Sequence, residues 1–302
     1  MKCYIICPYI QTGGPEAMHQ LCNEINLLAT THQAYMVYLN KPTTSVTSLL
    51  YADDYPYLKE ALFKEIEDSP ANIVVLPEIY TKRQLPFYSI RVAIWWLSVN
   101  NAIQFNTFYE NLKQVIHLFQ SEYASTTILK HHPQANIRTF MLHDYTRVLA
   151  EPALLYAPQK RANKIAYNPT KDTILPTLIH AQYLVPLVNL NKEELHDALL
   201  GCKLYIDLGS HPGQDRLPRE AAMAGCVVIT NKAGAADNAI DIPIEEKVED
   251  SAALFQLIQH VFENDNDNYK HYYKKQEPYR IAIANEKTRF TEEVRHILSI
   301  FE

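Results

Sequence analysis

The sequence predicts an α/β protein with two domains, each built from a parallel β-sheet covered by helices on both faces. Short apolar runs of strand length alternate with amphipathic segments of helix length along almost the whole chain. The chain has 302 residues, which is about twice the usual size of one domain. Residues 150–163 carry two prolines and show little periodicity, as an interdomain linker does. We therefore expect one domain over residues 1–155 and a second over residues 156–302.

The first half begins with an apolar run, Cys3–Cys7, that we expect to be a buried strand. Gly13 and Gly14 follow it. Pro15 then stands where a helix is expected to begin, because proline lacks an N–H that the first helical turn leaves unpaired. The further strands expected are residues 34–39, 72–76, 90–99, 115–119 and 137–142, and the expected helices are residues 16–29, 57–66 and 122–130.

The second half repeats this alternation. Its expected strands are residues 165–167, 183–187, 203–208 and 226–229. Its expected helices are residues 172–181, 192–200, 218–224, 251–262 and 282–301. The last helix has two expected placements, either within the second domain or packed back on the first.

The composition excludes some classes of protein. The formal net charge of −6 argues against general nucleic-acid binding. No apolar run approaches the roughly 20 residues that a membrane-spanning helix needs. The five cysteines form no CxxC pair, so we expect buried, reduced thiols and a cytoplasmic protein. There is no HExxH motif and no Asp-x-Asp run at an expected strand end, so we expect no metal ion.

Contact with the inner face of the cytoplasmic membrane is a secondary expectation. Residues 265–275 are acidic at first and then rich in tyrosine and lysine, which are residues suited to an anionic membrane surface. A solvated helix face is the simpler explanation of the same pattern.

Glycine marks two candidate sites. The chain has only seven glycines, where average usage would give roughly twenty, so we expect them where the backbone turns sharply or approaches a ligand. Gly13 and Gly14 are adjacent, and their backbone N–H groups are suited to a phosphate or a sugar. A tight turn without a ligand is the alternative at that position. The other five glycines are residues 201, 209, 213, 225 and 234.

The second candidate site lies in Lys203–Ile229, which we expect to form a strand, a loop, a helix and a strand. A helix that begins at the carboxyl end of a parallel strand is a common place for an anionic ligand. Charged or polar residues gather there, namely His211, Gln214, Asp215, Arg216, Arg219 and Glu220. At other expected strand ends, single polar residues are better explained as helix caps or loop hydrogen bonds. These are Glu78, Ser98, Asn100, Ser121, His143 and Asp144.

Residues Leu217–Val228, with the sequence LPREAAMAGCVV, resemble a motif of the GT-B glycosyltransferases, and most of all of their retaining, family-4-like branch. Glu220, Gly225 and Val228 keep the family spacing. The resemblance covers most of the second half of the chain, while the first half resembles the family in topology and in its glycine pair. It implies two Rossmann-like domains that face a central cleft, with a nucleotide-diphosphate sugar as co-substrate and no other cofactor.

The resemblance also implies roles for single residues. Glu220 is expected to accept hydrogen bonds from the ribose hydroxyls, which suits an acceptor-only carboxylate. Lys171, after the first strand of the second domain, is expected to bind the diphosphate as a point charge. Lys171, Glu220 and Arg216 form the expected catalytic set. The expected donor-binding residues are Gly13, Gly14, Lys171, Gly213, Arg219 and Glu220.

Three positions depart from the family pattern. Pro212 stands where the family has a first glutamate, Asn168–Thr170 lack its arginine, and Ser98–Asn101 replace a histidine of the first domain. The leading hypothesis is a metal-independent, retaining glycosyltransferase that acts on a glycan or lipid-linked acceptor in surface polysaccharide assembly. The departures keep two alternatives open: a catalytically silent nucleotide-sugar-binding subunit and a nucleotide-sugar epimerase.

Overall fold

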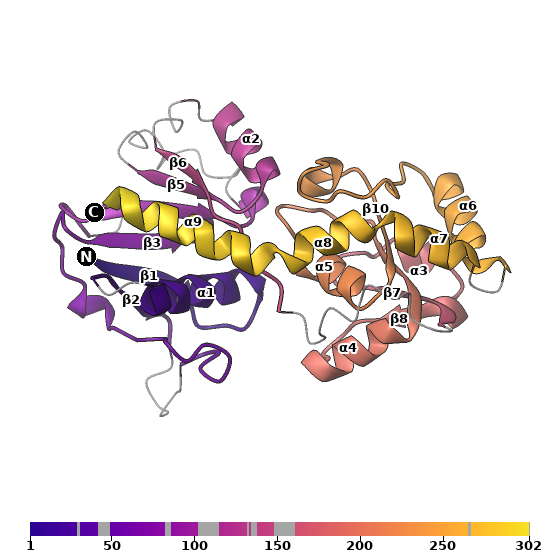
Figure 1. Ribbon diagram of the computed structural model, residues 1–302, viewed down its shortest axis with the longest axis horizontal. Helices are drawn as coiled ribbons and strands as arrows, with labels where there is room; N and C mark the ends of the chain where they lie inside the picture. The colour runs from indigo at the N-terminus through magenta and orange to yellow at the C-terminus, as the bar shows by residue number, and fades with distance from the viewer. Residues whose placement is uncertain are drawn as a thin grey trace. The chain divides into compact units, whose positions relative to one another are not determined.

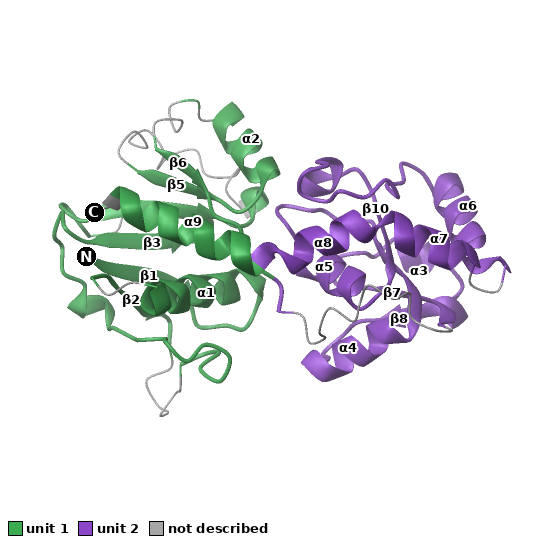
Figure 2. Cartoon of the chain, in the orientation of Figure 1, with its two compact units in different colours: residues 1–145, 287–302 green, residues 146–286 purple. Residues whose placement is uncertain are grey.

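The chain divides into two compact units (Figure 2). The computed structural model describes residues 1–28, 31–41, 49–81, 86–101, 115–131, 133, 138–147, 161–264 and 267–301. Unit 1 comprises residues 1–145 and 287–302, and unit 2 comprises residues 146–286. The division thus falls between residues 145 and 146, where the sequence suggested 155 and 156. Most of the expected linker lies outside the described residues.

Unit 1 is built on a six-stranded sheet, sheet A, in which every pair of neighbouring strands is parallel. The strand order is β2-β1-β3-β4-β5-β6. The strands are β1 (Lys2–Pro8), β2 (Gln33–Leu39), β3 (Ile73–Pro77), β4 (Arg91–Trp96), β5 (Ile116–Phe119) and β6 (Thr139–Met141). The helices are α1 (Gly13–Leu28), α2 (Glu122–His131) and α9 (Glu286–Phe301), with short 3-10 helices η1 (Phe63–Glu65), η2 (Glu78–Tyr80) and η3 (Val99–Asn101).

Helices cover both faces of sheet A. On one face, Met18 and Leu21 of α1 and Val294 and Ile297 of α9 join the hydrophobic core. Figure 1 shows α9 lying along the strands of this sheet. On the other face, Ile128 of α2 packs against the strands. Because both faces are covered, the strands are apolar on both sides and read as continuous hydrophobic runs in the sequence.

Unit 2 contains a four-stranded parallel sheet, sheet B, with the order β10-β9-β7-β8. Its strands are β7 (Ala162–Tyr167), β8 (Leu184–Pro186), β9 (Cys202–Asp207) and β10 (Val227–Thr230). Its helices are α3 (Leu175–Leu178), α4 (Lys192–Leu200), α5 (Arg216–Met223), α6 (Ser251–Phe262), α7 (Asp267–Lys275) and α8 (Glu277–Ala284), with 3-10 helices η7 (Ala181–Tyr183) and η8 (Gly234–Asp237). α4, α5 and α8 share a core on one face, and α3, α6 and α7 on the other.

Two of the expected helices are wrong and a third is divided. Residues 57–66 contain only η1, because the backbone there pairs with Met36 of β2. Residues 172–181 form only the single turn of α3 and the start of η7. The expected last helix is two helices, α8 and α9, that meet at Asn285, and α9 lies in unit 1.

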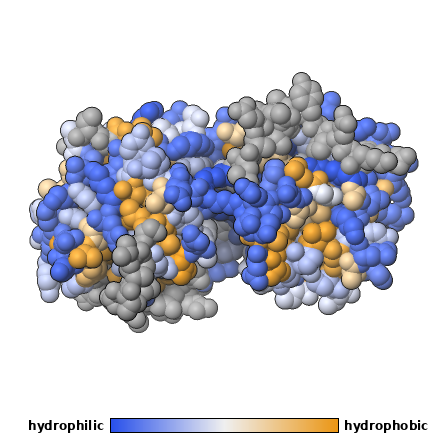
Figure 3. Space-filling model, turned by 90° about the horizontal axis from the view of Figure 1, so that it is seen from below, coloured by the Kyte–Doolittle hydropathy of each residue, from blue (hydrophilic) through white to orange (hydrophobic). Residues whose placement is uncertain are grey.

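The exposed hydrophobic residues and the cysteines are distributed as in most globular domains of known structure. On the face drawn in Figure 3, hydrophobic residues lie in small groups between hydrophilic ones. Within the described ranges, no helix combines the length and the apolar character needed to cross a bilayer. All five cysteines are buried and free, as expected.

Candidate functional site

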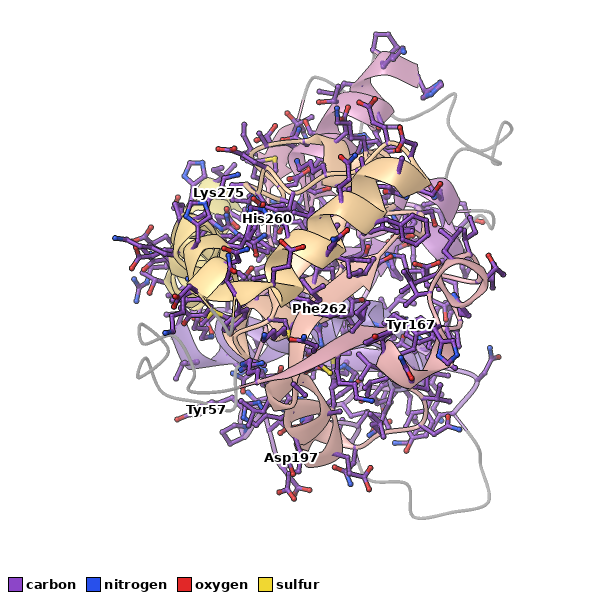
Figure 4. The ribbon with its side chains drawn as sticks, turned by 90° about the vertical axis from the view of Figure 1, so that its right-hand side faces the viewer. Tyr57, Tyr167, Asp197, His260, Phe262 and Lys275 are labelled. Carbon is purple, nitrogen blue, oxygen red and sulfur yellow. The ribbon has the colours of Figure 1, made fainter. Side chains whose placement is uncertain are left out.

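The carboxyl ends of β7 and β9 lie side by side, because these strands are parallel neighbours in sheet B. Tyr167, labelled in Figure 4, is the last residue of β7, and the chain continues from it to Lys171. Asp207 is the last residue of β9, and the β9–α5 loop (residues 208–215) leads from it into α5. Asp172 joins these connections by accepting a hydrogen bond of 3.0 Å from the first N–H of the β9–α5 loop. Lys171 is thereby held against that loop.

Lys171 lies inside a cluster of ion pairs. Its Nζ is 2.6 Å from Oδ2 of Asp215 and 3.1 Å from Oδ2 of Asp207. Nδ1 of His211 is 3.4 Å away. The Asp207 and His211 side chains are buried, whereas those of Lys171 and Asp215 keep exposed fractions of 20% and 27%. The Lys171–Asp215 pair is therefore the part of the cluster that a ligand can reach from solvent.

Asp215 is the N-cap residue of α5, yet its carboxylate makes no capping hydrogen bond to that helix. An aspartate at this position usually accepts a hydrogen bond from an N–H of the first turn. Here the carboxylate is turned to Nδ1 of His211, at 2.9 Å, and to Lys171. Burial alone would raise the pKa of Asp215, but the hydrogen bond from His211 and the charge of Lys171 lower it below its ordinary value. The ammonium group of Lys171 thus lies beside the start of α5, which the Asp215 side chain does not cap.

Glu220 belongs to the same electrostatic environment. It lies on α5 and is half-buried. The buried phenol of Tyr205 donates a hydrogen bond of 3.2 Å to Oδ2 of Asp207. Burial raises the pKa of Tyr205, and the negative charges of Asp207, Asp215 and Glu220 raise it further. Glu220 is therefore near enough to Tyr205 for its charge to act on that phenol, while Lys171 contacts Asp207, the partner of the same phenol.

Glycines allow the loops of the cluster to approach closely. A Cβ atom on Gly209 would lie 2.7 Å from Cγ and 2.9 Å from the carbonyl oxygen of Lys171. Gly234 has a φ of +59°, and a Cβ atom on it would overlap the carbonyl oxygen of His211. A larger residue at either position would displace the cluster. Gly213 lies buried in the β9–α5 loop, two residues before the N-cap of α5.

The two arginines of α5 have different surroundings. Arg219 is buried, with Nη1 3.1 Å from Oε2 of Glu286. It also donates hydrogen bonds to the carbonyl oxygens of Asp215 (3.1 Å) and Gln214 (2.9 Å). These contacts fix the β9–α5 loop and engage the guanidinium, and the expected contact of Arg219 with a phosphate stays a prediction. Arg216 is the first residue of α5 and is half-buried, and its expected contact stays a prediction.

Gly13 and Gly14 lie in unit 1, at the first two positions of α1 and not in a loop before it. Gly13 is exposed and Gly14 is half-buried. A Cβ atom on Gly14 would make an ordinary contact of 3.6 Å with Cδ1 of Leu97. Neither glycine has a positive φ, so neither is there for a strained turn. Their expected contact with a donor sugar stays a prediction.

His211 and Asp215 were predicted to lie at this site but not to be partners of Lys171, and Asp207 was not predicted at all. Asp207, His211 and Asp215 follow one another at intervals of four residues, and this spacing was the available signal. Their ligand atoms lie within 4.8 Å of one another, so they form a group able to hold a metal ion, which corrects the expectation that the chain has no such cluster. The ammonium group of Lys171 lies within 3.4 Å of one atom of each, so a positive charge already stands among them.

Comparison with known proteins identifies the fold. No family model matches the sequence, and no curated protein does. The crystal structure of a glycosyltransferase from Rickettsia africae is similar over 99% of this chain and 97% of its own, with 13% identity and a TM-score of 0.61. The N-terminal domain of a trehalose-6-phosphate phosphatase from Candida albicans is similar over 98% and 96% of the two chains, with 8% identity and a TM-score of 0.63.

A UDP-N-acetylglucosamine 2-epimerase is similar over 99% of this chain and 97% of its own, with 12% identity and a TM-score of 0.55. Further glycosyltransferases are among the similar structures. The chain has the GT-B fold. Because the identities are so low, the likeness establishes this fold and nothing finer. Within the GT-B fold, the cluster around Lys171 belongs to unit 2, at the carboxyl edge of sheet B.

Proposed function

We propose that the protein transfers a sugar from a nucleotide-diphosphate sugar, whose diphosphate binds beside Lys171 at the start of α5. The placement of Asp215 carries this proposal. Asp215 is the N-cap residue of α5 but turns its carboxylate to Lys171, so an ammonium group lies beside a helix start that the Asp215 side chain does not cap. Phosphate groups bind at such places, because the N–H groups and the helix dipole both favour negative charge. The GT-B fold suggests the reaction class.

On binding, the diphosphate of the donor would replace the Asp215 carboxylate as the partner of the Lys171 ammonium group. The diphosphate takes the exposed side of Lys171, while buried Asp207 stays as the fixed counter-charge on the other side. Glu220 accepts hydrogen bonds from the ribose hydroxyls. As the glycosidic bond breaks, negative charge grows on the departing diphosphate, and Lys171 and the first N–H groups of α5 stabilise that charge. Arg216 adds positive charge from the same helix turn.

The finer features of the proposal rest on the resemblance of Leu217–Val228 to the family-4-like branch. They are a retaining outcome, independence of metal ions, and a glycan or lipid-linked acceptor in surface polysaccharide assembly. A cytoplasmic location with peripheral contact at the inner membrane belongs to the same proposal. Gly13 and Gly14 would approach the donor sugar from unit 1.

Calorimetric titration with UDP, ADP and GDP tests the donor site. We expect at least one of them to bind, and Lys171→Met to weaken its binding by about tenfold or more, because a charge-assisted hydrogen bond to phosphate is lost. Lys270→Met is the matched control, since Lys270 is an exposed lysine of α7 that pairs only at the surface with Asp267. Equal losses in the two variants, or no nucleotide binding by the wild type, contradict the proposal.

An epimerase is the second candidate, because an epimerase is among the structures with this fold. The two reactions differ in their need for an acceptor. An epimerase converts a UDP-sugar to its isomer when no acceptor is present, whereas a transferase releases UDP only as the sugar moves to an acceptor or to water. Nuclear magnetic resonance of the sugar products after incubation without acceptor separates them. Nucleotide binding without either turnover would favour the catalytically silent subunit.

A further inference from the structure

Tyr51 of unit 1 has a backbone conformation that its side chain does not favour. Its φ is +58°, in the left-handed region, where a bulky side chain is strained. Among the described residues, the others with positive φ and a side chain are Asn40, Asn189 and Asn264. Asparagine tolerates this region because its short polar side chain makes local hydrogen bonds, whereas the long aromatic side chain of tyrosine cannot. Strained residues of this kind gather at binding and catalytic sites, where the surrounding structure enforces them.

The surroundings of Tyr51 enforce the strain and fix its ring. The phenol donates a hydrogen bond of 3.3 Å to the carbonyl oxygen of Thr12, directly before the first residue of α1. The ring meets the ring of His19 edge to face, with centroids 4.9 Å apart. The carbonyl oxygen of Tyr51 accepts hydrogen bonds from the N–H groups of Asp54 (3.1 Å) and Tyr55 (3.0 Å). The ring is therefore held, half-buried, against the first turn of α1.

Further aromatic rings extend this surface at the carboxyl ends of β1 and β2. Tyr9, which follows β1, meets Tyr38 of β2 at right angles, with centroids 5.1 Å apart. The rings of Tyr38 and His19 are buried and contact each other, with centroids 5.7 Å apart, whereas Tyr9, like Tyr51, is half-buried. The ammonium group of Lys41 lies 5.6 Å from the centroid of Tyr9. Several tyrosines of this tyrosine-rich chain thus form one aromatic cluster with His19 at this edge of sheet A.

We propose that Tyr51 and Tyr9 form a saccharide-binding surface, the stacking surface, in unit 1. Aromatic rings offer flat faces to the apolar C–H side of a sugar ring, and their hydroxyl groups are polar tips for its hydroxyls. Exposed Asp53 stands two residues from Tyr51, and a carboxylate accepts hydrogen bonds from sugar hydroxyls but repels an anion. The ammonium group of Lys41 is paired with Glu60 at 2.7 Å, so a neutral saccharide fits this surface better than a phosphate does. The inference deepens the proposed function, since this saccharide would be the acceptor.

Saturation-transfer nuclear magnetic resonance with maltotriose, cellotriose and chitotriose tests the stacking surface. We expect the wild type to bind at least one trisaccharide and Tyr51→Phe to keep it, because the ring remains. Tyr51→Asn should weaken binding tenfold or more, because the ring is lost. Asparagine is chosen because it tolerates the left-handed backbone conformation. Tyr57→Asn is the matched control, since Tyr57 is 48% exposed in the same segment and is labelled at the periphery of Figure 4.

Thermal unfolding shows whether Tyr51 contacts the saccharide or only stabilises the fold of unit 1. Asparagine suits a positive φ, so the midpoint of Tyr51→Asn should stay within about 4 °C of the wild type. A wild type that binds none of the three trisaccharides, or a Tyr51→Asn variant that binds as the wild type does, overturns the stacking surface. Titration of the same variants with UDP, ADP and GDP keeps the two proposals apart, because loss of the stacking surface leaves nucleotide binding in unit 2 unchanged.

Discussion

Asp215 competes with a phosphate for the ammonium group of Lys171. The two side chains are 2.6 Å apart and both are partly exposed, so a diphosphate must displace an existing ion pair before it reaches Lys171. We predict that Asp215→Asn tightens nucleoside diphosphate binding by about threefold to tenfold, the range set by a partly exposed pair. The amide keeps an acceptor for His211 but removes the competing charge. Calorimetric titration of the nucleotide that binds the wild type measures the change.

Asp267→Asn is the control for that substitution. Asp267 pairs with Lys270 on α7 and its side chain is 83% exposed, so loss of its charge should leave nucleotide affinity unchanged. Weaker binding by Asp215→Asn at an unchanged melting temperature would refute the competition. It would indicate that the carboxylate itself takes part in holding the ligand.

His19 makes the stability of unit 1 depend on pH. Its Nδ1 donates to the carbonyl oxygen of Pro15 at 2.6 Å, so Nε2 is the acceptor for the phenol of Tyr38, also at 2.6 Å. Burial lowers the pKa of His19 to about 4, although the hydrogen bond to Pro15 and the charge of Glu16 oppose this. The unfolded chain, with a pKa of about 6.5, binds the proton more readily. The stability from neutral His19 is therefore complete above about pH 6.5 and is lost as the pH falls towards 4, by about 3 kcal/mol.

Urea unfolding followed by tryptophan fluorescence measures this dependence. Both tryptophans of the chain, Trp95 and Trp96, lie in β4, so the signal reports unit 1. We expect His19→Gln to be less stable than the wild type at pH 7 and to lose less stability between pH 7 and pH 4.5. Parallel pH profiles for the two proteins would show that another group is responsible.

At the scale of elements, Gly209 positions the Lys171 connection against the β9–α5 loop. Because a Cβ atom would lie 2.9 Å from the backbone oxygen of Lys171, we predict that Gly209→Ala moves Lys171 and weakens nucleotide binding about tenfold. The unfolding free energy should fall by about 1–3 kcal/mol, as in other overpacked sites. Gly201→Ala is the matched control. At Gly201, with φ of −73° at the end of α4, a Cβ atom meets nothing closer than 3.5 Å, so its stability should change little or rise. Equal effects of the two substitutions would rule out the close approach at Gly209.

The sequence predicted elements well where their ends are encoded locally. The bounds of α4 and α6 agree with the predicted ranges, because Asn191 and Asp250 cap these helices with their own side chains. Residues 57–66 were misread, because their backbone bonds to Met36 of β2, and pairing with a strand overrides a local helical pattern. Local signals therefore sufficed where the hydrogen-bond partners are close in sequence.

The candidate site shows the same limit. Lys171 and Glu220 could be singled out as candidates, because Lys171 follows a recognisable strand and Glu220 lies within a recognisable motif. The pairing of Lys171 with Asp207 and Asp215 was not predicted, because these acids are 36 and 44 residues away in the sequence and only the folded loops bring them to its ammonium group. The ion pair of Arg219 is likewise with a residue distant in sequence, Glu286. The four-residue spacing of Asp207, His211 and Asp215 marks the cluster, but nothing in the sequence shows which distant cation pairs with it.

At the scale of the whole molecule, the chain leaves unit 1, forms unit 2 and returns to unit 1 through α9. The sequence left the placement of α9 open for two reasons. Asn285 separates α8 from α9 without a proline or glycine to mark the boundary. An amphipathic pattern also does not reveal against which of the two sheets a helix packs. Polar contacts with charged side chains hold α9 on unit 1, in addition to its hydrophobic packing. Thr291 donates a hydrogen bond of 2.6 Å to Glu24 of α1, and Glu293 lies 2.6 Å from Nδ1 of His143.

The two units should also differ in their response to a defect in α9. Phe290 is fully buried against Trp95 and Tyr145, with ring centroids 6.5 Å and 5.3 Å apart. We predict that Phe290→Ala lowers the unfolding free energy of unit 1 by about 3–5 kcal/mol, because it leaves a cavity in the core of sheet A. Hydrogen exchange should then accelerate in β1, β3 and β4, while β9 and β10 stay protected and nucleotide affinity stays within about twofold.

The control for this substitution is Ile300→Ala, which removes a 46%-exposed side chain from the same helix and should change neither unit. Equal acceleration of exchange in sheet A and sheet B after Phe290→Ala would mean that the two units unfold together. In that case the stability of the nucleotide site would depend on the core beneath α9, and nucleotide binding should weaken in step with the loss of protection. Independent behaviour would instead mean that the diphosphate site needs only the loops and helices of unit 2, since every contact of Lys171 described above lies between residues 146 and 286.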